Sequence, residues 1–149
     1  GVNKDWKCPL EEIKVGTGRK LKDGDQVAIL TVGPIGNDAQ KAIQALPQRD
    51  KVAHYDMRFI KPLDGDLLDE IGKKFKKVIT IEDGVRNGGF GSAVLEWFND
   101  HGYAPSVQRM GLPVEFVTHG SVDELRRIVG LDAPHIQQNI EAMLASDQV

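Results

Sequence analysis

Residues 78–98 read VITIEDGVRNGGFGSAVLEWF, and this stretch decides the predicted fold. It opens with an apolar, mostly β-branched run, which is typical of a buried strand. Glu82 and Asp83 then lead into a turn with glycines at positions 84, 88, 89 and 91, after which apolar residues recur at helical spacing. A strand, a glycine turn and a helix form the repeating unit of parallel α/β sheets. We therefore predict an α/β fold in which residues 78–82 are an inner strand.

The remaining sequence continues this alternation of strands and helices. The predicted elements are strands at 18–21 and 26–32, a helix at 39–46 capped by Asn37 or Asp38, a strand at 51–59, a helix introduced by Pro62 and Asp64, a strand at 106–110, and helices that begin at Ser121 and Asp132. An Asp-Gly turn between the first two strands predicts that they are antiparallel neighbours. Crossover connections join the later strands, which should be parallel. The expected architecture is a three-layer α/β/α fold around a five-stranded mixed sheet with its first strand antiparallel.

Composition and charge argue against several classes of function. The 149 residues are 40% hydrophobic and 28% charged, as in one ordinary soluble domain. We expect residues 1–17 to be an arm that connects an upstream domain to the domain at 18–149. A net charge of −3 gives no reason to expect nucleic acid or a membrane surface as a partner. Cys8 is the sole cysteine, which excludes an internal disulfide and fits a reducing, cytoplasmic compartment.

The glycine turn allows two interpretations. Gly88 and Gly89 can permit positive φ or close packing of a helix on a strand, or the helix start that they precede can hold an anion. Their spacing matches neither dinucleotide nor P-loop fingerprints. Glu82 and Asp83 lie at the carboxyl edge, where open α/β sheets hold their ligands. Adjacent residues of a strand point in different directions, so these two carboxylates are poorly placed to work as an acid–base pair.

Three more side chains are candidates for contact with a ligand or a neighbouring domain. Arg58 and Arg86 lie near the ends of predicted strands and could hold a phosphate or a carboxylate. His119 ends the long connection at 111–120, and loops of that length are often functional. The histidines have no metal-ligand spacing, and no nucleophile lies beside a base. We therefore predict no catalytic, cofactor-binding or metal-binding residue within this chain.

Several segments together carry a resemblance to a known family. They are residues 56–64 (DMRFIKPLD), the Glu82-Asp83 turn with residues 88–94 (GGFGSAV), 111–113 (GLP), 118–121 (THGS) and 130–132 (GLD). From about Gly18 onward the sequence closely resembles the C-terminal domains of 1-deoxy-D-xylulose-5-phosphate synthases. More loosely, it resembles the C-terminal domains of transketolases and of 2-oxoacid dehydrogenase β subunits.

This resemblance implies a transferase of the transketolase type. Such an enzyme condenses pyruvate, after decarboxylation, with glyceraldehyde 3-phosphate for isoprenoid, thiamine and pyridoxal synthesis. The family binds thiamine diphosphate and Mg²⁺ through the two preceding domains, whose motifs are absent here. The resemblance thus implies a structural and assembly domain that packs on upstream domains of a cytoplasmic homodimer and is inactive alone.

Two alternatives remain open. The chain could be a separately encoded subunit, or part of a transketolase or of a 2-oxoacid dehydrogenase β subunit. It could also be a small anion-binding α/β module that uses the helix start after Gly88 and Gly89.

Overall fold

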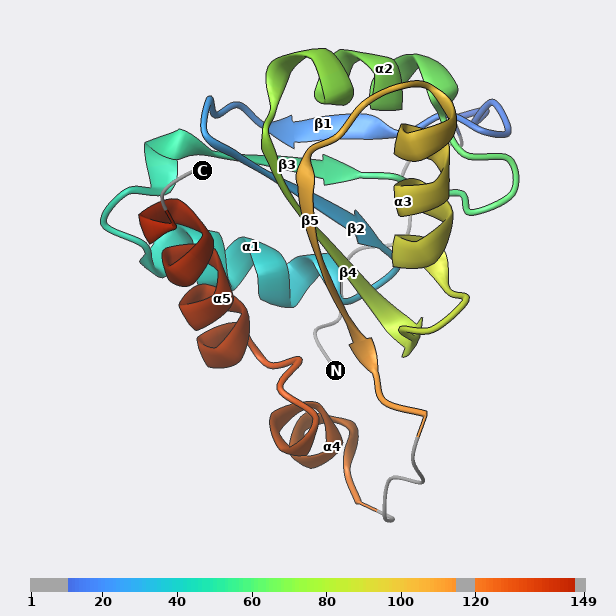
Figure 1. The fold of residues 1–149 in the computed structure, drawn as a ribbon. Coiled ribbons are helices and arrows are strands. Elements are labelled where there is room, and N and C mark those ends of the chain that lie inside the picture. The colour runs from blue at the N-terminus through green and yellow to red at the C-terminus, as the bar shows by residue number, and fades with distance from the viewer. Residues whose placement is uncertain (1–10, 115–119, 147–149) are drawn as a thin grey trace.

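One mixed sheet organises the chain. The computed structural model describes residues 11–114 and 120–146. In chain order its elements are β1 (Arg19–Lys22), β2 (Val27–Val32), α1 (Gly36–Ala45), the short 3₁₀ helix η1 (Arg49–Lys51), β3 (Val52–Asp56), α2 (Gly65–Lys74), β4 (Lys77–Val85), α3 (Phe90–Asp100), β5 (Ser106–Leu112), α4 (Val122–Ile128) and α5 (Ala133–Ala145). The strand order is β1-β3-β2-β4-β5 (Figure 1). Only β1 runs antiparallel to its neighbour, so the predicted mixed sheet of five strands is confirmed.

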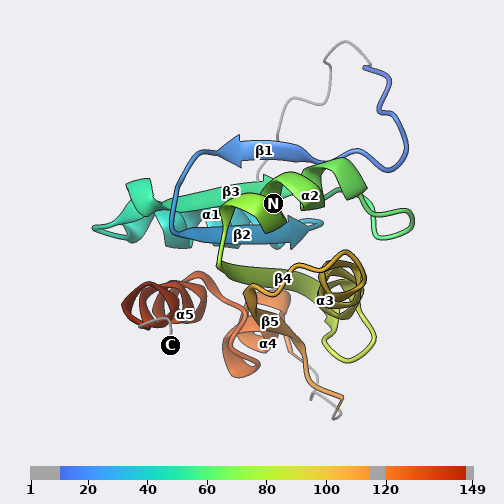
Figure 2. The ribbon, with the colours of Figure 1, turned by 45° about the horizontal axis from the view of Figure 1, so that its top comes forward.

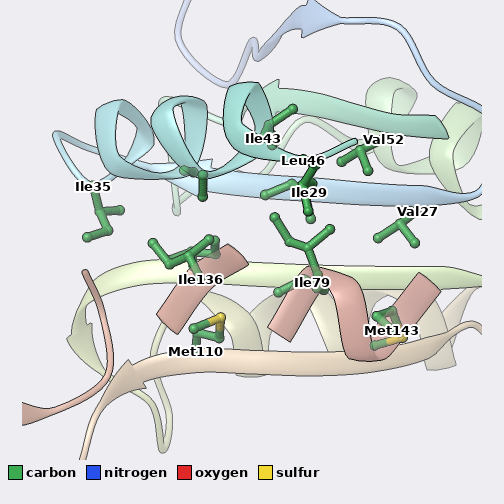
Figure 3. Packing of buried hydrophobic residues seen from close by; sticks show 14 of the residues in the cluster. Val27, Ile29, Ile35, Ile43, Leu46, Val52, Ile79, Met110, Ile136 and Met143 are labelled. Carbon is green, nitrogen blue, oxygen red and sulfur yellow. The ribbon is translucent and has the colours of Figure 1, made fainter. Parts of the chain in front are cut away.

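Helices cover both faces of this sheet, as Figure 2 shows. Helices α1 and α5 pack on one face and helices α2 and α3 on the other, which gives two apolar cores. In the first core, residues of α1 and α5 meet Ile29, Val52 and Ile79 of the strands (Figure 3). β4 lies between β2 and β5, and its residues 78–81 are almost completely buried. The prediction of an inner strand at 78–82 is therefore confirmed.

Local capping signals explain where several helices begin. The Asp64 side chain accepts a hydrogen bond from Leu67 N at 3.0 Å and caps α2. Ser121 and Glu124 form the reciprocal capping box of α4, and Asp132 caps α5. The predicted cap of α1 is wrong. This helix already begins at Gly36, after Ile35, and no side chain caps it, so the predicted capping residues lie inside its first turn.

The predicted pairing of the first two strands is also wrong. β1 pairs with β3, which lies between β1 and β2. The reason is the path of the turn at 23–26, where the backbone N–H groups of Asp25 and Gln26 donate to Lys51 O. Gly24 permits this path, since a Cβ there would lie 2.3 Å from Ala53 N. The turn therefore crosses the start of β3 instead of closing a tight hairpin.

Three strand boundaries differ from the prediction. β3 ends at Asp56 and not at position 59, because the chain turns at Arg58. β4 continues to Val85 through an irregularity after Ile81, and Val85 pairs with Leu112 of β5. β5 correspondingly extends two residues beyond Met110. Backbone pairing between β4 and β5 thus orders residues that the sequence predicts to be a loop.

Candidate functional site

The strand order locates the crevice where an open α/β sheet holds a ligand. From β2 the chain moves outward to β3 and then returns past β2 to β4. The direction of winding therefore reverses between β2 and β4, and ligands of such folds bind outside the carboxyl ends of the strands at this point. Here the crevice is bordered by the start of α1 and by the end of β4.

A side chain of the protein itself occupies this crevice. Arg126 of α4 donates to Asp38 of α1 at 2.8 Å and also forms an ion pair with Asp83 of β4. The Arg126 side chain is only 16% exposed, and the hydrogen bond with Asp83 raises its pKa above the ordinary value. A charged cavity of about 380 Å³ opens beside these ion pairs, between α1 and α4. The three charges tie α4 to the sheet and supply the partners that an outside ion would otherwise provide.

Glu82 has a structural role inside the domain. The residue is 5% exposed, and its two carboxylate oxygens accept the backbone N–H groups of Phe90 at 2.8 Å and Gly91 at 2.9 Å. The first N–H groups of a helix lack partners within the helix and favour a negative charge. The sequence predicts that Glu82 faces a ligand or a neighbouring domain, but its carboxylate faces α3. These two N–H groups are therefore not open to a phosphate.

The glycines of the turn make this contact possible. A Cβ on Gly89 would lie 2.2 Å from Glu82 Oε2 and 2.3 Å from Val85 O. Gly89 has a φ of −86°, so close contact and not a left-handed backbone requires glycine there. Gly88 does have a positive φ, +76°. Of the two predicted interpretations of the turn, the structure supports close helix–strand packing.

A second set of hydrogen bonds holds the turn in place on the side of β5. Ser92 Oγ accepts from Gly88 N at 3.0 Å and from Arg109 Nη1 at 2.6 Å, and it donates to Arg86 O. The Arg86 backbone N–H donates to Leu112 O at 2.9 Å. The Arg86 residue is exposed at this edge. Its backbone is therefore held in place while its side chain lies at the surface.

Arg58 has an unusual backbone. Its φ of +56° is the only positive value among the non-glycine residues that the structure describes. Its N–H donates to Asp56 Oδ1 at 3.2 Å, and Asp56 also pairs with Arg19. Left-handed backbone costs an ordinary residue energy and is often kept at functional positions. The half-buried Arg58 remains a candidate for contact with a neighbouring domain or an anion. His119 lies outside the described residues.

Neither a metal-ligand cluster nor a membrane-spanning helix is found among the residues that the structure describes. No group of three or more His, Cys, Asp or Glu side chains could hold a metal ion there. None of the helices described is long and apolar enough to cross a membrane.

Comparison with known proteins places the fold in a family. The family model described as "Transketolase, C-terminal domain" matches residues 16–136. The chain belongs to this family. Among solved structures it is similar to one titled "Split gene transketolase, inactive beta4 tetramer", with a TM-score of 0.82 and 27% identity. That match covers 93% of this chain and 45% of the other.

Curated relatives of the chain include several 1-deoxy-D-xylulose-5-phosphate synthases. The chain is 52% identical over 142 residues to the 1-deoxy-D-xylulose-5-phosphate synthase of Bacteroides thetaiotaomicron, covering 94% of this chain and 22% of that enzyme. It is 43% identical to the synthase of Porphyromonas gingivalis, covering 97% and 23%, and 42% identical to that of Geobacillus thermodenitrificans, covering 93% and 22%. The chain thus spans about a fifth of these enzymes and matches their C-terminal part. The predicted family resemblance is confirmed.

Sequence reasoning missed the residues that complete the site. Arg126 lies 88 residues from Asp38 and 43 from Asp83, and Arg109 lies 17 from Ser92. No local pattern marks such pairs, because the fold alone brings them together. The one available signal was the position of Asp83 at the carboxyl end of an inner strand, where a carboxylate can pair with a cation.

Proposed function

We propose that this chain is the C-terminal domain of a 1-deoxy-D-xylulose-5-phosphate synthase. The observation that carries the proposal is 52% identity to such an enzyme over 94% of the chain. In this proposal residues 18–149 form the domain and residues 1–17 connect it to upstream domains. The whole enzyme condenses pyruvate with glyceraldehyde 3-phosphate, releases CO₂ and works as a cytoplasmic homodimer.

The role we assign to this domain is structural, with no catalytic group. Thiamine diphosphate supplies the carbanion chemistry of such enzymes, and its diphosphate needs a divalent metal such as Mg²⁺ and matching ligands. The described residues offer no metal-ligand cluster, and the Asp38 and Asp83 carboxylates of the crevice are already paired with Arg126. The site residues present here therefore do not fit the cofactor, which supports its binding by the other domains.

A domain exchange tests the assignment. The C-terminal domain of the Bacteroides thetaiotaomicron enzyme is replaced by this chain, and CO₂ release from pyruvate and glyceraldehyde 3-phosphate is measured with thiamine diphosphate and Mg²⁺. We expect activity within about tenfold of the parent, a barrier change of about 1.4 kcal/mol. A second exchange with the corresponding domain of a transketolase is the control. A folded, dimeric chimera without activity, or one no better than this control, would contradict the assignment.

The chain alone should show neither turnover nor saturable thiamine diphosphate binding up to about millimolar concentration, the weak end of ordinary affinities. A separately encoded subunit is the second candidate, because the similar solved structure is described as the product of a split gene. Mixing this chain with a synthase truncated before its C-terminal domain separates the two cases. Restored activity would favour the subunit, and activity only in the covalent chimera would favour the domain.

A further inference from the structure

A second cavity lies away from the carboxyl-edge crevice. It has a volume of about 330 Å³, is open to solvent on one side and is lined by residues of β1, α1 and β3. Its lining residues are Leu21, Lys22, Gln40, Ile43, Gln44 and His54. None of them takes part in the ion pairs or turns described above. Small-molecule sites have volumes from about 300 Å³ upward, so the space suits a molecule of one or two rings.

His54 is the unexpected residue of this cavity. It is 2% exposed, and the neighbouring positions of this sheet face, Ile29 and Val52, are hydrophobic. Burial lowers the pKa of His54 to about 4, although Asp56 opposes the change, so the imidazole is neutral near pH 7. A buried polar ring costs stability unless its nitrogens find partners. A hydrophobic residue would fill this position without that cost.

The hydrogen bonds of His54 leave one nitrogen available. Thr31 Oγ1 lies 3.0 Å from His54 Nε2 and donates its single proton to Tyr55 O at 3.3 Å. With that proton directed at Tyr55 O, the hydroxyl oxygen accepts from Nε2–H, and Nδ1 of this tautomer is an acceptor. Nδ1 has no hydrogen-bond partner in the part of the chain that the structure describes.

The remaining lining groups offer a charged ligand no free hydrogen-bonding partner of opposite charge. The Lys22 ammonium has three protons, and it donates to the carbonyl oxygens of Asp23, Arg49 and Val52, so none is left for an anion. No lining residue carries a carboxylate that could pair with a cation. Asp56, on the same face of β3, is already paired with Arg19.

We propose that this cavity is a binding site for a small, uncharged ring compound that carries both a hydrogen-bond donor and an acceptor. The donor meets His54 Nδ1, and the amides of Gln40 and Gln44, one helical turn apart on α1, bind the acceptor. Leu21 and Ile43 pack against the ring. The site is independent of the proposed function, since it uses no residue of the carboxyl edge.

Nicotinamide and nicotinate are the probes that test this site. Both have the same ring, but nicotinamide carries a neutral amide and nicotinate a carboxylate. Each is titrated into the ¹⁵N-labelled chain at pH 7, and amide shifts are followed by NMR. We expect nicotinamide to shift the amides of residues 40–44 and 54 with a Kd of about 1 mM, and nicotinate to bind at least about tenfold more weakly.

Matched variants locate the binding. Gln44→Ala removes one amide from an exposed position, so the fold should persist, and nicotinamide should bind about fivefold more weakly. Gln138→Ala removes an exposed glutamine of α5 outside the cavity and should leave the Kd unchanged. His54→Leu, with folding checked in the same spectra, should abolish the shifts. Equal binding of nicotinate, no shifts up to about 20 mM nicotinamide, or equal effects of the two glutamine variants would overturn the proposal.

Discussion

The contact between Gly89 and Glu82 gives the most specific stability prediction. In Gly89→Ala the new Cβ would overlap with Glu82 Oε2 at 2.2 Å and with Val85 O at 2.3 Å. The backbone at position 89 cannot easily move away from β4, so the Glu82 carboxylate has to move to make room for the new Cβ. It would then lose its hydrogen bonds to the N–H groups of Phe90 and Gly91.

The size of the effect follows from these two bonds. Hydrogen bonds to a charged group contribute about 1.5–3 kcal/mol each, and a buried carboxylate without partners costs more. The loss of both predicts a destabilisation of about 3–6 kcal/mol. Domains of this size have a free energy of unfolding of about 5–15 kcal/mol. Gly89→Ala should therefore remove a large part of the stability, and Gly89→Val at least as much.

Urea unfolding followed by circular dichroism measures this difference, with Gly88→Ala as the matched control. Gly88 has a φ of +76°, but a Cβ there meets nothing within 4 Å. Its replacement by alanine should cost only the strain of a left-handed backbone, about 1–2 kcal/mol. If both variants lose the same free energy of unfolding, the contact with Glu82 does not explain the glycine at position 89.

Three further predictions use other parts of the structure. The free energy of unfolding should fall by about 1.6 kcal/mol between pH 6.5 and 5, because there the unfolded chain protonates His54 and the folded chain does not. Urea melts of wild type and His54→Gln with the same pH dependence would refute this. Arg58→Gly should be about 1 kcal/mol more stable than Arg58→Ala, which keeps the left-handed strain, and equal thermal melts would show that no strain exists. Arg126→Met should lower hydrogen-exchange protection in α4 and leave β2 and β4 protected, whereas uniform loss across the domain would contradict a local role.

Local patterns predicted those features that depend on neighbouring residues. The apolar run at 78–81 marked an inner strand because burial on both faces requires it. Asp64 and Ser121 marked helix starts because a side-chain cap is made within three residues. Asn37 and Asp38 failed as caps since the chain enters α1 one turn earlier through Gly33 and Pro34, whose backbone carbonyls accept the first N–H groups.

The candidate site depends on contacts between residues that lie far apart in the sequence. The sequence places Glu82 at a strand end, but its role depends on the return of α3 to within 3 Å of its carboxylate. β1 pairs with β3, which follows β2 in the sequence but lies between β1 and β2 in the sheet. The cavity at His54 likewise joins three elements, and the periodicity of each one alone gives no sign of it.

The ion pairs of Arg126 also have a consequence for synthesis on the ribosome. Asp38 precedes Arg126 by 88 residues and Asp83 precedes it by 43. At about 5–20 residues per second, the ribosome makes Asp38 about 4–18 seconds before its partner exists. Asp38 can pair early with Lys41 of the same helix, whereas the ion pair of Asp83 has to wait for Arg126. Asp83 therefore gains its ion pair only when the last quarter of the chain is translated, and a nascent chain that stalls before α4 leaves this carboxylate without Arg126 at the crevice.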